Sequence, residues 1–560
     1  MKIFKGKSGA AGIFAAKAIY FEKQQRGEEK ISLSEAYSKA LCRIEKLKEK
    51  ATREIGEDEA KIFEAYRMLL CDEVLKSQID NEIKQGESTL AAVGKVTEKM
   101  AAALAKKDNE YLKRRADDIL YVGGLIKDAV CGEDDTFAFP NDGESYIVAA
   151  KELTPVDTMT FDKKRLKGIV TLLGGATSHT VILAKSLGIP AIYGAESLEK
   201  IINGQKAIID GGKGVLITEP DKDTESKYEK LIKDREKFLA ELERIKKEKT
   251  KTLCGEKISL CINIGRPSDL EDSDLDGIDG VGLFRSEFLY SDSPQKPTLQ
   301  EQISAYREVI SKMSGKSVTV RTLDIGGDKR LDYIDMPIEE NPFLGRRGIR
   351  LCLRNKELFS EQLRAILIAA ANTENVKIMI PMVTAAREIE ATRKILEEIK
   401  AQLVCGGVDF CKSVSLGIMI ETPASAIMAD AFAKRCDFFS IGTNDLIQYI
   451  TASDRGNSEV EEIYSPYSPA VIQMLAKVIK AGERQGIEVS VCGDLAANPD
   501  FTKLLLGLGL KKFSVPLPIA QEIKYKIRGI SLAAAKETAK KVLAAQTEEE
   551  VKNILKEEEK

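Results

Sequence analysis

The sequence predicts a multidomain α/β protein that ends in a (β/α)8 barrel. At about 150 residues per domain, a chain of 560 residues suits three or four domains. Eight short apolar runs recur between residues 253 and 560, with helical pattern in most of the gaps, which is what a (β/α)8 barrel requires. A doubly wound sheet is the alternative, and the count of eight favours the barrel. The expected strands are Ile258–Asn263, Gly280–Phe284, Val318–Thr322, Lys377–Pro381, Leu416–Ile420, Phe438–Gly442, Val489–Gly493 and Phe513–Leu517.

Residues 1–29 and 141–221 are predicted to form one compact α/β domain. Short runs rich in Val and Ile alternate with turns in the second segment, and the first 20 residues are expected to add a strand. The start of the chain superficially resembles a signal peptide, but Lys17 interrupts its apolar run and folded-looking sequence follows directly. We therefore interpret it as part of the fold.

Residues 30–140 are predicted to form a helical bundle. Long amphipathic stretches with few Pro or Gly indicate about four helices, and Ser34 can cap the first. Such an insert is either structural or a docking surface for a partner, and the pattern alone does not separate the two. Residues 222–252 contain no Gly or Pro and are mostly charged, which predicts a solvated linker helix between domains.

The composition argues against several classes of protein. Lys and Arg total 85 and Asp and Glu total 88, a net charge of −3, so no basic field attracts nucleic acid. No run of about 18 apolar residues is present, so we expect no membrane insertion. The ten cysteines form no Cys-x-x-Cys pair, which favours a reduced, cytoplasmic protein. Gly6-Lys7-Ser8 resembles the end of a P-loop, but Met1 stands where its first glycine should be.

His179 is the only histidine, so a His-rich zinc site and a relay between two histidines are both excluded. It follows the Gly174-Gly175 turn, and helical pattern begins directly after it. The free N–H groups of a helix N-terminus favour phosphate, and neutral imidazole is a good nucleophile. Thr177 and Ser178 are natural caps there. An ordinary surface or core histidine is the alternative, and this context favours a nucleophile that handles phosphate.

Polar residues follow five of the predicted barrel strands, at the end of a barrel where active sites lie. Each one alone could be an ordinary solvated residue, but five strands that deliver complementary side chains to one face favour a functional site. These residues are Arg285, Glu287, Arg321, Glu421, Asn444, Asp445, Arg455 and Cys492.

Three kinds of chemistry are represented in this set. Glu421 and Asp445 supply carboxylate oxygens, which suit Mg²⁺ bridging to a bound phosphate. The arginines supply forked, permanent positive charge for phosphate and carboxylate oxygens. Cys492 is either a proton donor or a small buried filler, and the sequence leaves both open.

Several longer motifs extend these observations over nearly the whole chain. They are GGATSHTVILAKSLGIPAI around His179, then GVGLFRSEFLY, VRTLDIGGDK, ENPFLGRRGIR, IMIPMV, ETPASA, DFFSIGTNDLIQY, DRGN and VCGDLA. With these motifs in this order, the chain resembles enzyme I of the bacterial phosphoenolpyruvate:sugar phosphotransferase system (phosphoenolpyruvate–protein phosphotransferase). The resemblance implies a swivelling phosphohistidine α/β domain with a helical-bundle insert, a linker helix and a C-terminal phosphoenolpyruvate-binding (β/α)8 barrel.

The resemblance also implies a role for each site residue. His179 would carry the phosphoryl group, and Cys492 would protonate the enolate to give pyruvate. Glu421 and Asp445 would hold Mg²⁺. The residues implied to bind phosphoenolpyruvate are Arg285, Arg321, Arg347, Asn444, Asp445 and Arg455.

The partners are likewise implied by the resemblance. Residues 30–140 would bind the small phosphocarrier protein HPr, which accepts the phosphoryl group, and residues 253–560 would form a homodimer. Family members often have Arg at the position of Ala176, and an acidic or small residue at Leu172 and Leu173. These departures leave the rate and the partner affinity open.

Two other functions compete with this interpretation. Pyruvate–phosphate dikinase and phosphoenolpyruvate synthase have a similar histidine domain and barrel but carry a large ATP-grasp domain in front. Here only about 140 residues, helical in pattern, precede the histidine domain. A regulatory docking protein that has lost turnover is the second alternative, and the presence of every motif residue argues against it.

Overall fold

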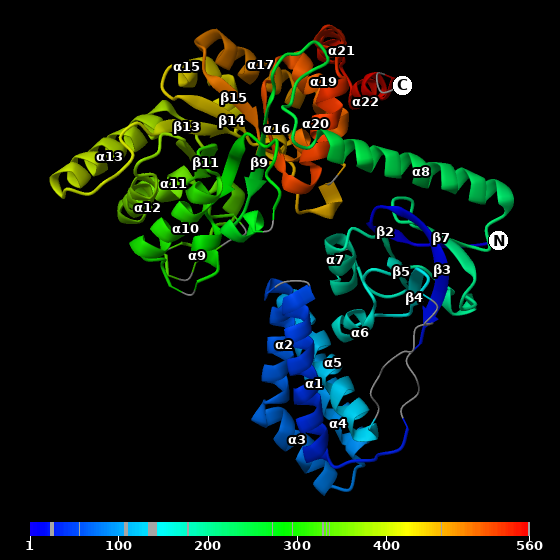
Figure 1. Ribbon diagram of the computed structural model, residues 1–560. Helices are drawn as coiled ribbons and strands as arrows, with labels where there is room; N and C mark the ends of the chain where they lie inside the picture. Colours follow the sequence, from blue (N-terminus) through cyan, green and yellow to red (C-terminus); the bar gives the residue numbers. More distant parts are fainter. Residues whose placement is uncertain are drawn as a thin grey trace. The chain divides into compact units, whose positions relative to one another are not determined.

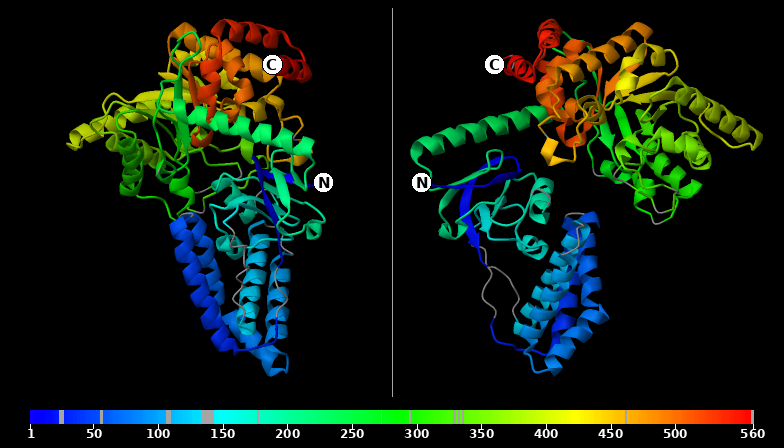
Figure 2. Two further views of the ribbon diagram at one scale, coloured as in Figure 1. Left: turned by 45° about the vertical axis from the view of Figure 1, so that its right-hand side comes forward. Right: turned by 180° about the vertical axis from the view of Figure 1, so that it is seen from behind.

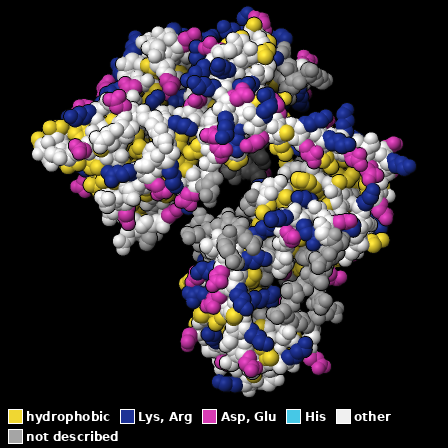
Figure 3. Space-filling view, in the orientation of Figure 1, with side chains coloured by type: hydrophobic (Ala, Val, Ile, Leu, Met, Phe, Trp, Pro, Cys, Tyr) yellow, Lys and Arg dark blue, Asp and Glu magenta, His cyan; other side chains and the backbone are white. Residues whose placement is uncertain are grey.

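The computed structural model covers residues 1–560 in two compact units, Met1–Lys237 and Phe238–Lys560 (Figure 1). It describes the whole chain except residues 23–26, 55–56, 106–109, 133–142, 176–177, 272, 294, 328–329, 332, 335, 461 and 558–560. No helix in the described part is both long enough and apolar enough to cross a membrane. On the face shown in Figure 3, acidic and basic side chains are interspersed.

The first unit contains a mixed eight-stranded sheet in the order β1-β8-β7-β3-β4-β5-β6-β2. Its start contributes three strands rather than the single one expected, because two glycines, Gly6 and Gly12, interrupt the extended run. The central strands β3 to β6 are parallel, and the outer pairs are antiparallel. The strands are β1 (Lys2–Lys5), β2 (Lys7–Ala10), β3 (Ile13–Phe21), β4 (Tyr146–Ala150), β5 (Leu166–Thr171), β6 (Ala191–Tyr193), β7 (Lys206–Asp210) and β8 (Val215–Thr218).

Two short helices, α6 (Pro155–Thr160) and α7 (His179–Ser186), belong to this sheet domain. The buried residues Val181 and Ala184 fix α7 on one face of the sheet, in the same apolar cluster as Ile169. This packing places His179 at the first residue of the helix.

In the sequence, five described helices follow β3 and precede β4, where about four were expected. They form a helical bundle (Figure 2). The additional break occurs because Asp72 caps a new helix and accepts hydrogen bonds from the next backbone N–H groups. Ser34 lies inside the first helix, and Ser32 caps it instead, in a reciprocal pair with Glu35. The helices are α1 (Leu33–Glu54), α2 (Glu57–Leu70), α3 (Glu73–Lys84), α4 (Thr89–Ala105) and α5 (Glu110–Cys131).

Helix α8 (Lys222–Ile245) is continuous across the boundary between the two units. In the first unit, the Tyr228 hydroxyl lies 3.2 Å from Asp210 Oδ2. In the second, the ring of Phe238 meets Tyr525 edge-to-face at 5.1 Å. Just beyond the end of the helix, buried Lys524 donates to the Lys246 carbonyl at 2.6 Å. Each half of the helix is therefore attached to its own unit.

The second unit is a closed barrel of eight parallel strands in the order β10-β11-β12-β13-β14-β15-β16-β9. All eight expected strands are present, with ends shifted by a residue or two. The strands are β9 (Ser259–Ile264), β10 (Gly280–Arg285), β11 (Ser317–Arg321), β12 (Val376–Ile380), β13 (Ser415–Ile420), β14 (Phe438–Ile441), β15 (Glu488–Val491) and β16 (Lys512–Pro516).

Helices surround this barrel and bury its outer surface in one large apolar cluster. They are α9 (Phe288–Ser291), α10 (Leu299–Lys312), α11 (Ile349–Arg354), α12 (Lys356–Ala369), α13 (Ala386–Cys405), α14 (Pro423–Ile427), α15 (Ala429–Ala433), α16 (Thr443–Thr451), α17 (Pro469–Gln485), α18 (Asp494–Ala497), α19 (Pro499–Leu508), α20 (Leu517–Gly529), α21 (Leu532–Ala544) and α22 (Glu548–Glu557).

Inside the barrel, a second and smaller apolar cluster packs below the carboxyl ends of the strands. It joins Leu283, Met379, Met419 and Phe438 to Cys492. Gly417 lies against the Phe438 ring, and any larger side chain at 417 would clash with it. This packed layer fills the barrel interior below the polar residues of its upper end.

Candidate functional site

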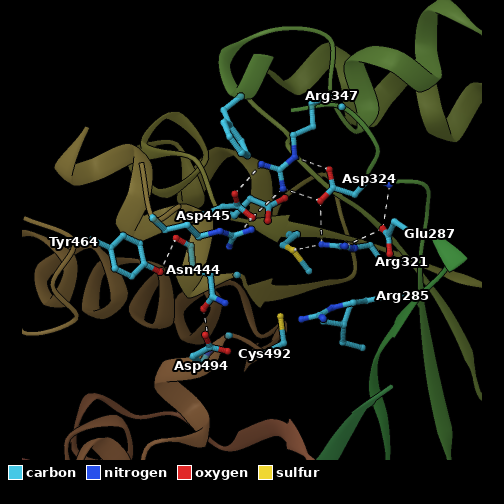
Figure 4. A pocket seen from close by; sticks show the side chains of 18 residues that line it. Arg285, Glu287, Arg321, Asp324, Arg347, Asn444, Asp445, Tyr464, Cys492 and Asp494 are labelled. Carbon is cyan, nitrogen blue, oxygen red and sulfur yellow. Dashed lines mark hydrogen bonds and ion pairs between the residues drawn. The ribbon is translucent and has the colours of Figure 1, made fainter. Parts of the chain in front are cut away.

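A pocket of about 600 Å³ opens at the carboxyl ends of the barrel strands (Figure 4). Every site residue predicted in the barrel lines it, which brings together residues up to about 200 positions apart in the chain. These are Arg285, Arg321, Arg347, Glu421, Asn444, Asp445, Arg455 and Cys492.

The strands explain why these side chains converge. Arg285 and Arg321 are the last residues of β10 and β11, and Glu421 and Cys492 directly follow β13 and β15. Parallel strands of a barrel deliver their carboxyl ends to one rim. Asp445 lies in the first turn of α16, directly after β14.

Arg321 is fixed by two carboxylates. Its Nη2 lies 2.8 Å from Glu287 Oε1 and its Nη1 lies 3.1 Å from Asp324 Oδ2. Burial alone would lower the pKa of Arg321, but the two carboxylates outweigh burial and raise it. Its buried Nε has no hydrogen-bond partner among the described residues. The side chain is therefore permanently charged and held in one orientation at the pocket wall.

Arg347 joins two acidic residues that come from distant parts of the chain. Its guanidinium donates to both oxygens of Asp324 at 3.0 Å, and to the two oxygens of Asp445 at 2.8 and 3.0 Å. A fifth contact reaches the Tyr449 hydroxyl at 3.4 Å. All of its donor positions thus face protein acceptors. Gly326, at φ 127°, makes the approach possible, because a Cβ there would lie 2.8 Å from Arg347 Cα.

Glu421, which also lines the pocket, is almost completely buried. Its Oε1 accepts a hydrogen bond from the Met382 backbone N–H at 2.7 Å. Burial, followed by the negative charges of Asp445 and Asp324, raises the pKa of Glu421 to about 8. Burial is therefore the main reason why Glu421 holds its proton more strongly than usual, and the two neighbouring carboxylates add to this effect.

This donor set fits Mg²⁺. Glu421 and Asp445 offer hard oxygens, and the raised pKa of Glu421 indicates that further positive charge would be stabilising. In the described part of the chain, no group of three or more His, Cys, Asp or Glu side chains could hold a metal. A pair of carboxylates is nevertheless enough for Mg²⁺, which usually keeps several waters and binds through one or two carboxylates and substrate phosphate.

The outer wall of the pocket is less constrained. Arg285 and Arg455 are both exposed, and Arg455 Nη1 reaches only to 4.0 Å from Asp445 Oδ2. Asn444 is held more firmly, because its Oδ1 accepts from the Asp494 backbone N–H at 2.9 Å. Two exposed arginines therefore face a rigid, charged inner wall.

Cys492 lies at the floor of the pocket. Its Sγ lies 3.5 Å from the Ile441 carbonyl, and Asn263 Nδ2 donates to its backbone carbonyl at 3.0 Å. Burial raises the pKa of Cys492 to about 11. The thiol consequently keeps its proton at neutral pH, which suits an acid rather than a nucleophile.

His179 belongs to the other unit, at the start of α7. Ser178 occupies the N-cap position with extended backbone, but its side chain makes no capping hydrogen bond. Ser178 thus occupies the predicted cap position without the hydrogen bond that its hydroxyl could make there. Thr177 and Ala176 lie outside the described residues. Leu172 is half-buried and Leu173 is exposed.

Sequence reasoning missed Asp324, which contacts both buried arginines. Its position three residues after Arg321, still close to the end of β11, is a signal that could have identified it. Tyr464 was also missed. Its hydroxyl donates to the Asn444 carbonyl at 3.2 Å, and it lies in a loop with no strand to mark it.

Three protein domain families match successive parts of the chain. Their descriptions are PEP-utilising enzyme, N-terminal, for residues 5–115, PEP-utilising enzyme, mobile domain, for residues 142–214, and PEP-utilising enzyme, PEP-binding domain, for residues 239–532. Together with the barrel and its pocket, these matches define a PEP-utilising enzyme.

Individual relatives narrow this class. The phosphoenolpyruvate-protein phosphotransferase of Listeria innocua is 39% identical, with 99% of each chain covered, and that of Bacillus subtilis is 39% identical with 100% of each covered. The chain therefore belongs to the phosphoenolpyruvate–protein phosphotransferase family. A solved structure described as Enzyme I (nEIt) is 36% identical over 42% of this chain and 99% of its own, with a TM-score of 0.35.

Proposed function

We propose that this protein transfers the phosphoryl group of phosphoenolpyruvate to its own His179 and from there to a histidine of the carrier protein HPr. The proposal depends on one observation: three kinds of side chain line the same pocket. They are a pair of carboxylates, arginines of which some are exposed and some are held by ion pairs, and a protonated thiol. We place the protein in the cytoplasm because its ten cysteines have no pairing pattern.

In this proposal the pocket residues bind and orient the substrate. Exposed Arg285 and Arg455 close on the phosphoryl and carboxylate oxygens, while Arg321 provides a fixed positive charge. Arg347 acts by holding Asp445 in place, with Asn444 beside it. Glu421 and Asp445 would hold Mg²⁺, which when bound draws charge from the phosphoryl oxygens. Catalysis of this type is mainly positioning and electrostatic stabilisation.

Cys492 supplies the proton that completes the reaction. When His179 takes the phosphoryl group, the leaving enolpyruvate must gain a proton at its methylene carbon to become pyruvate. The Cys492 thiol carries that proton at neutral pH and lines the same pocket.

We assign each step of the phosphoryl transfer to a different domain of the chain. We assign residues 1–29 and 141–221 to the phosphohistidine domain, 30–140 to HPr binding, 222–252 to the linker and 253–560 to the barrel and its homodimer contact. The donor phosphoenolpyruvate and the acceptor HPr cannot occupy one site, so His179 must move between them as a rigid body. We assign the hinges of that movement to the linker, residues 222–252, which passes from the first unit to the second.

The test uses phosphoenolpyruvate labelled in its phosphoryl group. With Mg²⁺, we expect acid-labile label on His179 and its transfer to purified HPr. A His179→Ala variant that still took up label would refute the assignment, and an ATP requirement would favour the synthase interpretation. A protein that takes up no label under any condition would support the docking alternative.

A further inference from the structure

A buried glutamine lies behind the wall of the pocket that carries Arg321. Gln362 belongs to α12, one of the helices that surround the barrel, and it is only 1% exposed. It is not among the described residues that line the pocket. A primary amide has two N–H donors and one acceptor oxygen, and buried groups of this kind are held by hydrogen bonds. The partners of the amide therefore show which part of the barrel it holds.

Three hydrogen bonds hold the amide of Gln362 in one orientation. Its Oε1 accepts from the Leu323 backbone N–H at 2.9 Å. Its Nε2 donates to the hydroxyl of Ser286 at 2.9 Å and to that of Tyr306 at 3.0 Å. The Ser286 hydroxyl in turn donates to the carbonyl of Arg321 at 2.7 Å. Because a backbone N–H can only donate and a carbonyl can only accept, these bonds leave no choice of direction.

The two chain segments that this glutamine joins also carry the carboxylates that hold Arg321 (Figure 4). Ser286 directly precedes Glu287, whose Oε1 lies 2.8 Å from Arg321 Nη2. Leu323 directly precedes Asp324, whose Oδ2 lies 3.1 Å from Arg321 Nη1. Glu287 Oε1 also accepts from the Asp324 backbone N–H at 3.2 Å. A shift of either segment would consequently move a carboxylate, and the guanidinium with it.

We propose that Gln362 is a positioning residue for Arg321. It joins the segments that follow β10 and β11, so that both carboxylates and the backbone of Arg321 keep one position at the pocket wall. It acts only through the residues that it holds, because it lies behind the wall. The inference rests on the proposed function, since it assumes that phosphoenolpyruvate binds at Arg321.

The position of Gln362 along the strands explains why such a connection is needed. The pairing of β10 with β11 ends at Arg285 and Arg321. Beyond that pair the two segments are joined through side chains, and Gln362 supplies a rigid one from a packed helix. A binding group that is displaced by about 1 Å can cost about a hundredfold in rate. The orientation of Arg321 is therefore worth fixing from outside the strands.

The central test measures phosphoenolpyruvate binding to the full chain with His179→Ala, which cannot accept the phosphoryl group. Titration calorimetry with Mg²⁺ gives the Kd. Gln362→Met has a similar length but lacks the donors and the acceptor of the amide. We expect this variant to raise the Kd for phosphoenolpyruvate by about tenfold or more, because Arg321 is no longer held in place.

A second buried glutamine provides a matched control. Gln302 lies on α10, which packs against α12, and it is completely buried. Its Oε1 accepts from the Tyr290 hydroxyl at 3.0 Å, and its Nε2 donates to the Pro297 carbonyl at 3.2 Å and to Glu361 Oε1 at 3.3 Å. None of these three partners adjoins a described residue that lines the pocket. Gln302→Met should therefore lower the denaturation midpoint as Gln362→Met does, but leave the Kd unchanged.

Two smaller changes examine the path to Arg321. Ser286→Ala removes the hydroxyl between Gln362 and the Arg321 carbonyl, and it should raise the Kd in the same direction. Gln362→Glu has a donor for Ser286 only while its carboxyl is protonated, and burial favours that form. Compared with the unchanged Gln362 at each pH, its Kd should therefore approach the normal value as the pH falls from 9 to 5.5.

The outcomes are distinct. A higher Kd for Gln362→Met and Ser286→Ala, with a normal Kd for Gln302→Met, supports the positioning role. An unchanged Kd for Gln362→Met, or equal rises for the two glutamine variants, overturns it. A Kd ratio for Gln362→Glu that stays as high as that of Gln362→Met at every pH would also overturn it. If the protein with His179→Ala alone binds no phosphoenolpyruvate, the proposed function fails instead.

Discussion

Met382 donates its backbone N–H to Glu421 Oε1 from a left-handed conformation, with φ 59° and a distance of 2.7 Å. Non-glycine residues rarely adopt this conformation, and β-branched residues almost never do. The barrel therefore accepts local strain immediately after β12 in order to direct one donor at a buried carboxylate. Such strain is concentrated at functional sites.

A Met382→Val substitution tests this relationship. Valine is β-branched, so we expect the barrel to lose about 1–3 kcal/mol of stability as the backbone leaves the left-handed region or remains there under strain. Calorimetry of the full chain would follow the thermal transition of the barrel. Met382→Leu is the matched control and should cost less than about 1.5 kcal/mol. Equal losses in the two variants would mean that side-chain packing, and not the backbone, sets the cost.

Replacement of Arg347 by Met should destabilise the barrel strongly. It would leave the buried carboxylates of Asp324 and Asp445 without their shared partner, a loss of about 3–5 kcal/mol. Arg455→Met is the contrast, because its side chain is 40% exposed and 4.0 Å from Asp445. Its stability should stay within about 0.5 kcal/mol of the unchanged protein, while KM for phosphoenolpyruvate rises. Denaturant unfolding and steady-state kinetics measure the two effects, and an unchanged unfolding curve for Arg347→Met would contradict the structural role.

The opposite end of the barrel should show a pH-dependent contribution from Glu488. Its Oε1 lies 2.9 Å from the ammonium groups of both Lys512 and Lys377. Burial raises the pKa of Glu488, but the two lysines outweigh burial and lower it below its usual 4.5. A lowered pKa in the folded state stabilises the protein above pH 4.5, and this contribution is lost as the pH falls through the folded-state value.

A Glu488→Gln variant should therefore be less stable at pH 7 than the unchanged protein, and the difference should shrink below pH 4. Glu488 is 39% exposed, so solvent screening limits the loss to about 1 kcal/mol. Asp430→Asn provides the control, because it removes an exposed ion pair with Arg484 and should cost at most about 0.5 kcal/mol. A loss for Glu488→Gln that was constant from pH 7 to pH 3 would contradict this account.

Lys524→Met should loosen the attachment of α8 to the barrel. The buried ammonium donates to the Lys246 carbonyl at 2.6 Å, and burial lowers the pKa of Lys524. Without this donor the carbonyl loses its partner, at a cost of about 1–3 kcal/mol. Amide hydrogen exchange in residues 238–245 should become faster. Lys540→Met, on a surface pair with Glu537, should leave that exchange unchanged.

The fold of the barrel could be predicted from the sequence because each strand is a short buried apolar run, a local property. The residues that end those runs, such as Arg321 and Glu421, were predicted for the same reason, since the topology of parallel strands alone brings them together. Ser178 is a counterexample. Its position at the helix start was predicted, but whether a hydroxyl turns toward a free N–H depends on the local rotamer.

The buried ion network could not be predicted in this way. Arg347 lies 98 residues before Asp445 and 23 after Asp324, in a loop that no strand pattern marks. Sequence resemblance suggested that Arg347 belonged to the site, and only the geometry reveals that its donors face protein carboxylates. Two buried serines, Ser440 of β14 and Ser490 of β15, give a second example. Their hydroxyls lie 3.1 Å apart because the register of the two strands pairs them, and local pattern does not specify that register.

The ring of Phe438, packed with Leu283, Met379 and Met419, closes the axis of the barrel beneath Cys492. In the described part of the barrel, this packing leaves the carboxyl ends of the strands as the side from which a small molecule reaches the pocket. Spent pyruvate then blocks the path of the next phosphoenolpyruvate until it has diffused out. Release of pyruvate should for that reason limit turnover when the pyruvate concentration is high.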